Sequence, residues 1–131
     1  VVVDDASQDD SAARVQRWIA RCPPHITLQF IQHEVNQGAY AARNTGAAQA
    51  RGDYITVHDS DDWSHPDKLR LQVASLEQHP HAKASLSDWV RATPALLFHR
   101  WRLDEYGWVY PNISSLMVRR EVLDTLNTGS F

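Results

Sequence analysis

The stretch Asp53-Tyr54-Ile55-Thr56-Val57-His58-Asp59-Ser60-Asp61-Asp62-Trp63 decides the fold expected for this chain. Its apolar run over 54–57 is typical of a short buried strand, and three carboxylates follow within the next five residues. Charges of one sign at the end of a strand repel each other unless solvent screens them or a cation neutralises them. The Asp-x-Asp spacing suits a hard divalent ion, which takes one or two carboxylates and completes its coordination with water and phosphate oxygens. The stretch therefore predicts a strand that ends at a phosphate-linked metal site.

Strands and helices alternate on both sides of this stretch. Apolar patterning and turn residues predict strands at 1–3, 26–33, 53–58, 84–90, 96–101 and 115–118, and helices at 11–22, 39–51, 64–79 and 120–126. Successive strands joined by helices run parallel through right-handed crossovers. The pattern therefore predicts an α/β fold with an open, mainly parallel sheet and helices on both faces.

Polar side chains follow three of the predicted strands. They lie in the segments 4–7, 33–38 and 59–63. In open α/β sheets, ligands bind beyond the carboxyl ends of the strands. These three segments are therefore expected to form one site.

Composition limits the classes of function. The chain has 131 residues, a formal net charge of −3 and a pI near 6.1, which argue against nucleic acid as its partner. The single cysteine, Cys22, has no partner for an internal disulfide, and no apolar run reaches the length of a membrane span. The chain begins without Met inside a strand-like run and ends after a turn-like segment, so we read it as a fragment of a longer protein.

Four short motifs occur in a fixed order. They are Val3-Asp4-Asp5-Ala6-Ser7; Asn36-x-Gly38 with Ala42-Arg43-Asn44-x-Gly46; Ala50-x-Gly52-Asp53-Tyr54-Ile55; and Asp59-Ser60-Asp61-Asp62. Together they resemble a family 2 glycosyltransferase of the Rossmann-like GT-A fold, a nucleotide-diphospho-sugar transferase. The resemblance is strong over 1–79 and weaker over 112–122, and it makes the last motif the family's DXD motif.

The resemblance implies a role for each matched residue. Asp5 would accept a hydrogen bond from the uracil imide, with Asp4 supporting it, and Arg43 would contact the base or the diphosphate. Asp59 would face the ribose, and together with Asp61 it would hold Mn²⁺ or Mg²⁺, with Asp62 behind these ligands. The turn residues Asn36 and Gly38 complete the nucleotide-sugar site.

The resemblance also implies what the chain lacks. The family's first strand would precede Val1, which leaves the sheet incomplete, and the acidic segment with the general base would follow Phe131. Residues 1–131 would then be a single partial glycosyltransferase domain. Its nucleotide-sugar-binding part would be 1–79 and the start of its acceptor side 80–131. The fragment alone would be inactive.

The implied reaction is metal-dependent transfer of a sugar from a UDP-sugar to a glycan, lipid-linked or polysaccharide acceptor, with inversion. The full-length protein would work in the cytoplasm, or at the cytoplasmic face of a membrane. A catalytically inactive sugar-nucleotide-binding module is an alternative. A phospho-acceptor receiver domain is a weaker one, because neither Lys68 nor Lys83 follows a strand that could place it at a phosphate.

Structural interpretations of the same residues stay open. The Asp59–Asp62 segment can be a solvated loop that caps the next helix, and Asp4 with Asp5 can cap the helix that follows them. Arg43 can be an ordinary surface residue, and Asn36 and Gly38 can be simple turn residues. A band of aromatic residues can stack on an acceptor sugar or pack in a core; it comprises Phe98, Trp101, Tyr106, Trp108 and Tyr110.

Overall fold

The computed structural model describes residues 1–98 and 107–126, and its contacts divide the chain into two compact units. Unit 1 comprises Val1–Gly52 and the described residues from Leu123 on, and unit 2 comprises Asp53–Val122. In chain order the elements are β1 (Val2–Asp4), α1 (Ser11–Ile19), β2 (Phe30–Gln32), α2 (Ala39–Gln49), β3 (Tyr54–Thr56), α3 (Lys68–Gln78), β4 (Ala84–Trp89), β5 (Tyr110–Arg119) and α4 (Arg120–Leu126).

Unit 1 contains a parallel pair of strands with α2 packed against it. β1 pairs with β2, and Val3 lies opposite Ile31. A Cβ atom added at Gly46 of α2 would lie 3.5 Å from Cγ2 of Val3, so the small residues of this helix allow it to approach the strand closely. Helix α2 ends at Gln49 rather than at 51, because Ala50 adopts an extended conformation (φ −66°, ψ 140°).

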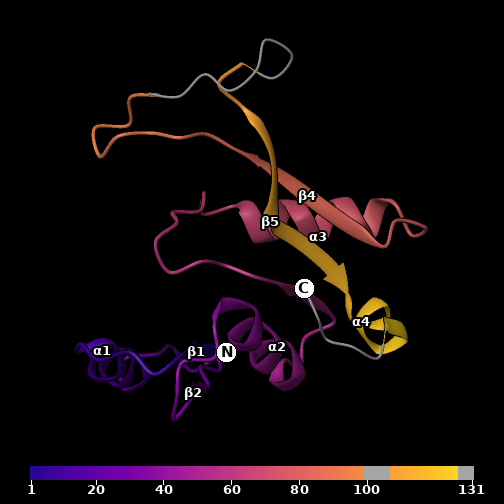
Figure 1. Ribbon diagram of the computed structural model, residues 1–131. Helices are drawn as coiled ribbons and strands as arrows, with labels where there is room; N and C mark the ends of the chain where they lie inside the picture. Colours follow the sequence, from indigo (N-terminus) through magenta and orange to yellow (C-terminus); the bar gives the residue numbers. More distant parts are fainter. Residues whose placement is uncertain (99–106, 127–131) are drawn as a thin grey trace. The chain divides into compact units, whose positions relative to one another are not determined.

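Unit 2 is built on an antiparallel sheet with the strand order β3–β5–β4. The long strand β5 lies between the other two. Helix α3 packs against β4 (Figure 1). The buried side chains of this unit include Ile55, Leu76, Tyr110, Met117 and Val118. This apolar core fixes the strand ends on which the polar residues described below are mounted.

The predicted α/β class agrees with the structure, whereas the pairing of the strands differs from a mainly parallel sheet. Among the described residues, only β1 and β2 pair in parallel. Strands β3 and β4, which α3 connects, do run in the same direction, as the crossover rule requires. They are not neighbours, because β5 inserts between them and runs in the opposite direction. Local sequence patterns cannot predict such an insertion, because it depends on pairing between residues far apart in sequence.

Element boundaries also differ from the predictions. The strand expected at 26–33 is restricted to β2, which pairs with a β1 of equal length, and the strand expected at 115–118 extends over 110–119. Of the strand expected at 96–101, Phe98 forms an isolated bridge to Ala92, and residues 99–101 lie outside the described ones. Helix α1 also ends earlier than the predicted residue 22, and its Trp18 is 68% exposed.

Candidate functional site

The segment Asp59–Asp62, called the carboxylate turn below, is held by backbone and histidine contacts. The amide of Asp62 donates to the carbonyl of Asp59 at 3.2 Å. Nε2 of His58 donates to the carbonyl of Asp62 at 3.2 Å, and Nδ1 of His58 accepts from the hydroxyl of Ser64 at 3.2 Å. His58 thus holds the carboxyl end of the turn, through Asp62 and through Ser64 two residues beyond it.

The carboxylates of this turn suit a hydrated hard cation. Asp61 and Asp62 are exposed, and the Asp61 carboxylate makes no hydrogen bond or ion pair within residues 1–98 and 107–126. The same residues hold no group of three or more His, Cys, Asp or Glu side chains that could form a protein-only metal cage. Carboxylate oxygens from Asp59 and Asp61, with positions left for water and phosphate, fit Mg²⁺ or Mn²⁺. The donor set therefore fits the metal that the resemblance implies.

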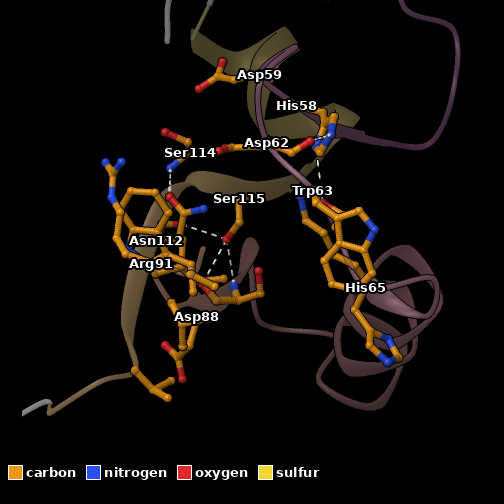
Figure 2. Close-up of a pocket in the computed structure, with 18 of the residues that line it drawn as sticks. His58, Asp59, Asp62, Trp63, His65, Asp88, Arg91, Asn112, Ser114 and Ser115 are labelled. Carbon is orange, nitrogen blue, oxygen red and sulfur yellow. Dashed lines mark hydrogen bonds between the residues drawn. The ribbon is translucent and has the colours of Figure 1, made fainter. Parts of the chain in front are cut away.

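The carboxylate turn lines a cavity of about 990 Å³ within unit 2. Its other walls come from α3, from β4 and the residues that follow it, and from the first half of β5. In the view of Figure 2, Asp59 and Asp62 lie at the top of this cavity, and Arg91 and Asn112 lie to the left. The cavity is large enough for a substrate and combines charged, polar and aromatic side chains.

A bulge in β5 shapes one wall of the cavity. Ser85 pairs with Met117 but Ser87 pairs with Asn112, so one residue of β4 faces four of β5. The hydroxyl of Ser115, which is 1% exposed, accepts from the amide of Ser87 at 2.9 Å and lies 2.7 Å from the carbonyl of Asn112 (Figure 2). Bulges of this kind re-aim side chains next to binding sites. No local residue pattern predicts this bulge.

In unit 1, the carboxylate of Asp5 organises the start of α2. It accepts hydrogen bonds from the amide of Gln37 at 2.9 Å and from the amide of Gly38 at 2.7 Å. Nδ1 of His33 lies 2.7 Å from the same carboxylate, and Nε2 of His33 lies 3.0 Å from the hydroxyl of Thr45. The amide of Gln37 above all, and then His33, hold the pKa of Asp5 below its usual value. Asp5 therefore stays ionised at neutral pH.

These contacts give Asp5 a structural role at the loop that leads into α2. Asp5 holds the backbone of this loop rather than capping the helix that follows Asp5 in sequence, and Gly38 supplies the backbone conformation (φ +90°, ψ 160°) that only glycine adopts readily. Asp4 is 7% exposed, and its carboxylate accepts from the Ser7 amide at 3.2 Å and from Nε2 of Gln32 at 2.9 Å. Sequence analysis missed His33, whose position between two hydrogen-bonding side chains depends on the fold.

Next to Asp5, Ala6 has a left-handed backbone conformation with φ +61°. A small cavity of about 290 Å³ opens here at the carboxyl ends of β1 and β2. It is lined by Ala6, Ser7, Gln8, Gln32, His33 and Glu34. This is the edge of the parallel pair at which a ligand is expected.

Replacing Ala6 by glycine is expected to stabilise the protein by about 1 kcal/mol, because glycine adopts this conformation without the steric cost that a Cβ atom brings. The measurement is the urea-unfolding midpoint of the intact gene product. Ala12→Gly, inside α1, is the matched control and should lower the midpoint. An unchanged or lower midpoint for Ala6→Gly would show that the positive φ of Ala6 does not destabilise the protein.

The structure thus groups the predicted site residues within each unit. Asp4, Asp5 and Gly38 gather at the edge of the β1–β2 pair, and Asn36 is an exposed residue of the same loop. The guanidinium of Arg43 lies 5.5 Å from the ring centroid of Tyr40, on the same helix. Asp59, Asp61 and Asp62 share the carboxylate turn of unit 2.

The aromatic band divides between core and cavity. Tyr110 is 5% exposed and its ring packs edge-to-face on Trp89, whereas Phe98 packs on Trp108 and lines the cavity. Trp101 and Tyr106 lie outside the described residues.

Sequence comparison identifies the family. The sequence profile of the family described as "Glycosyl transferase family 2" matches residues 1–126. The chain belongs to glycosyl transferase family 2. The resemblance drawn from the four motifs is thereby confirmed, and so is the assignment of the chain to a family of enzymes.

Relatives of this chain include a protein named as a glycosyltransferase and one named for succinoglycan biosynthesis. EpsE of Bacillus subtilis (strain 168), named as a glycosyltransferase, is 38% identical over 107 residues, which cover 82% of this chain and 34% of EpsE. The succinoglycan biosynthesis protein ExoO of Rhizobium meliloti is 41% identical over 73 residues, which cover 56% of this chain and 20% of ExoO. The chain thus spans about a third or less of these relatives.

Two solved structures share the fold. S. aureus TarS superposes with a TM-score of 0.72 at 21% identity, over 96% of this chain and 39% of TarS. A mannosyltransferase from Pyrobaculum calidifontis, solved with GDP-Man and Mn²⁺, gives a TM-score of 0.67 at 27% identity, over 97% of this chain and 36% of that protein. The chain therefore has the GT-A fold. Within the described part of the chain, every helix is too short or too polar to cross a membrane.

Proposed function

We propose that this glycosyltransferase moves a sugar from a nucleotide-diphospho-sugar, with a UDP-sugar as the expected donor, to a saccharide acceptor hydroxyl in the presence of Mn²⁺ or Mg²⁺. The observation that carries the proposal is the carboxylate turn. Its exposed Asp61, which has no partner among the described residues, lines a cavity large enough for a substrate. The mannosyltransferase with a related fold was solved with a nucleotide sugar and Mn²⁺, which supports the same class of donor here.

Asp61 and Asp59 would hold the metal, and Asp62 would support the turn from behind. When bound, the metal neutralises the negative charge that develops on the departing nucleoside diphosphate. The chain's own contribution is orientation. His58 and Ser64 fix the carboxylate turn, and the cavity excludes water from part of the donor.

In unit 1, the loop between β2 and α2 would contribute to nucleoside binding. Asp5 holds the amides of Gln37 and Gly38, so the acidic pair shapes the pocket at the strand ends. Asp4 and Asp5 would accept from the base, and Arg43, with Asn36 and Gly38 nearby in sequence, would complete the nucleotide contacts. These roles follow from the family motif, and the hydrogen bonds around Asp5 give it a structural task as well.

The acceptor side would lie in the second half of the chain, over 80–131, and nucleotide-sugar binding in 1–79. Polysaccharide synthesis is the expected process, because ExoO is named for succinoglycan biosynthesis. Inversion at the transferred carbon and action at the cytoplasmic face of a membrane complete the proposal.

A binding experiment on the intact gene product tests the donor class. Titration calorimetry with UDP, GDP and ADP, each with Mn²⁺ or with chelator, should show one nucleoside diphosphate that binds at least about tenfold more tightly when the metal is present. Sugars linked to UDP, GDP and ADP are then assayed for hydrolysis and transfer. Metal-independent binding of all three nucleotides would contradict the proposal, and tight metal-dependent binding without turnover would favour an inactive sugar-nucleotide-binding module.

A further inference from the structure

A guanidinium group stands in the cavity of unit 2 at a distance from the carboxylate turn. Arg91 follows β4 and lines the cavity, with its guanidinium carbon 4.8 Å from the ring centroid of Trp89. Trp89 in turn packs edge-to-face on Tyr110, with ring centroids 5.3 Å apart, and Tyr110 is buried. A guanidinium at this distance is attracted to the face of an indole ring, which favours one placement of the side chain. Arg91 is an exposed residue whose guanidinium is oriented by this contact.

No carboxylate of the described residues pairs with the guanidinium of Arg91. Among the described residues, no acidic group lies within 4.0 Å of its guanidinium, although Asp88 lines the same cavity. By contrast, Nε of Arg70 pairs with Asp67 at 3.0 Å. Lys68 at the start of α3 adds an ammonium group to the cavity wall, also without an ion pair to a described residue. An oriented cation without a counter-charge at a cavity wall is suited to bind an anion.

The sheet separates this cation from the carboxylate turn. β3 and β4 are the outer strands, both antiparallel to β5, so their carboxyl ends point the same way with β5 between them. The turn follows β3 and Arg91 follows β4, so β5 lies between the two strands that carry them. The strand ends also differ in level along β5, because Thr56 pairs with Met117 whereas Trp89 pairs with Tyr110. Asn112 and Ser114 of β5 line the cavity between these two strands. Arg91 and the carboxylate turn therefore belong to separate segments that line one cavity.

We propose that Arg91, oriented by Trp89, binds an anionic group of the acceptor saccharide, a phosphate or a carboxylate. The inference rests on the proposed function, which puts the donor diphosphate at the carboxylate turn. A guanidinium can bind either anion through two parallel N–H···O bonds. Arg91 then determines acceptor specificity, and the donor is bound without it.

The test compares matched acceptors in the intact gene product, with the donor found by the nucleotide panel. The acceptors are a neutral oligosaccharide, the same compound with a phosphate monoester, the same compound with a uronic acid, and a lipid-diphosphate-linked form. We expect at least one anionic acceptor to have a KM at least about tenfold below that of the neutral compound. Arg91→Gln should remove this difference and leave the KM of the donor unchanged, and Arg91→Lys should keep part of it.

Arg70→Gln is the matched control, because it removes a guanidinium of the same unit that does not line the cavity. It should keep the acceptor preference, and thermal melting shows whether each variant is folded. Two results would overturn the inference if metal-dependent donor cleavage is observed. The first is equal KM values for neutral and anionic acceptors, and the second is a rise of the donor KM in Arg91→Gln as large as that of the acceptor KM. The proposed function, and not this inference, would be overturned by a different pair of results. The protein would show no metal-dependent donor cleavage, but calorimetry would still show binding of the phosphorylated oligosaccharide that depends on Arg91.

Discussion

Replacing Asp61 by alanine is expected to lower metal-dependent cleavage of the nucleotide sugar by at least about a hundredfold. Asp61 is exposed in the carboxylate turn and makes no hydrogen bond or ion pair with any residue that the structure describes. The substitution therefore removes a metal ligand without breaking a structural contact, so the melting temperature should hardly change. The measurement is the initial rate of nucleoside diphosphate release by the intact gene product across a Mn²⁺ titration.

Asp10→Ala is a suitable control for the loss of one negative charge. Asp10 is exposed and pairs with Arg14 at 2.9 Å in unit 1, outside the cavity of the carboxylate turn. It should retain the activity of the unmodified protein at every metal concentration. Full activity of the Asp61→Ala variant in the presence of chelator would contradict the assignment of the metal site.

Arg119→Met is expected to destabilise the protein by about 2–3 kcal/mol, because a charged donor that satisfies backbone carbonyls is lost. Nη2 of Arg119 donates to the carbonyl of Leu76 at 2.6 Å, at the end of α3, and Nε donates to the carbonyl of Ala82 at 3.0 Å. Nη1 donates to the hydroxyl of Tyr54, which itself donates to Glu77. This one side chain of β5 therefore joins β3, the end of α3 and the turn before β4.

The loss should appear as a lower urea midpoint of unfolding with an unchanged slope. Lys83→Met is the control, since the exposed ion pair of Lys83 with Glu121 (2.8 Å) is screened by solvent and contributes little. Because Arg119 does not line the cavity, the KM values of the folded variant should stay close to those of the unmodified protein. If the urea midpoint of Arg119→Met equals that of Lys83→Met, the carbonyls of Leu76 and Ala82 must accept hydrogen bonds from other donors in the variant.

Much of the fold could be predicted because local patterns report local structure. The small residues of α2, the turn at Gly38 and the apolar run before Asp59 each gave the correct element. The crossover rule gave the shared direction of β3 and β4, but the insertion of β5 between them depends on pairing between residues far apart in sequence, such as Ile55 with Val118. Patterns that span a few residues carry no record of that pairing.

The same distinction holds for the site. The sequence by itself determined the family, through four ordered motifs, and the presence of exposed carboxylates directly after a strand, because turn chemistry and apolar patterning are local. Only the tertiary structure decided that Asp5 holds the loop before α2 through the amides of Gln37 and Gly38, and that Arg91 lies over the ring of Trp89 at a cavity wall. The physical reason is that hydrogen bonds and ring contacts depend on distances of a few ångströms, which are set when distant segments pack together.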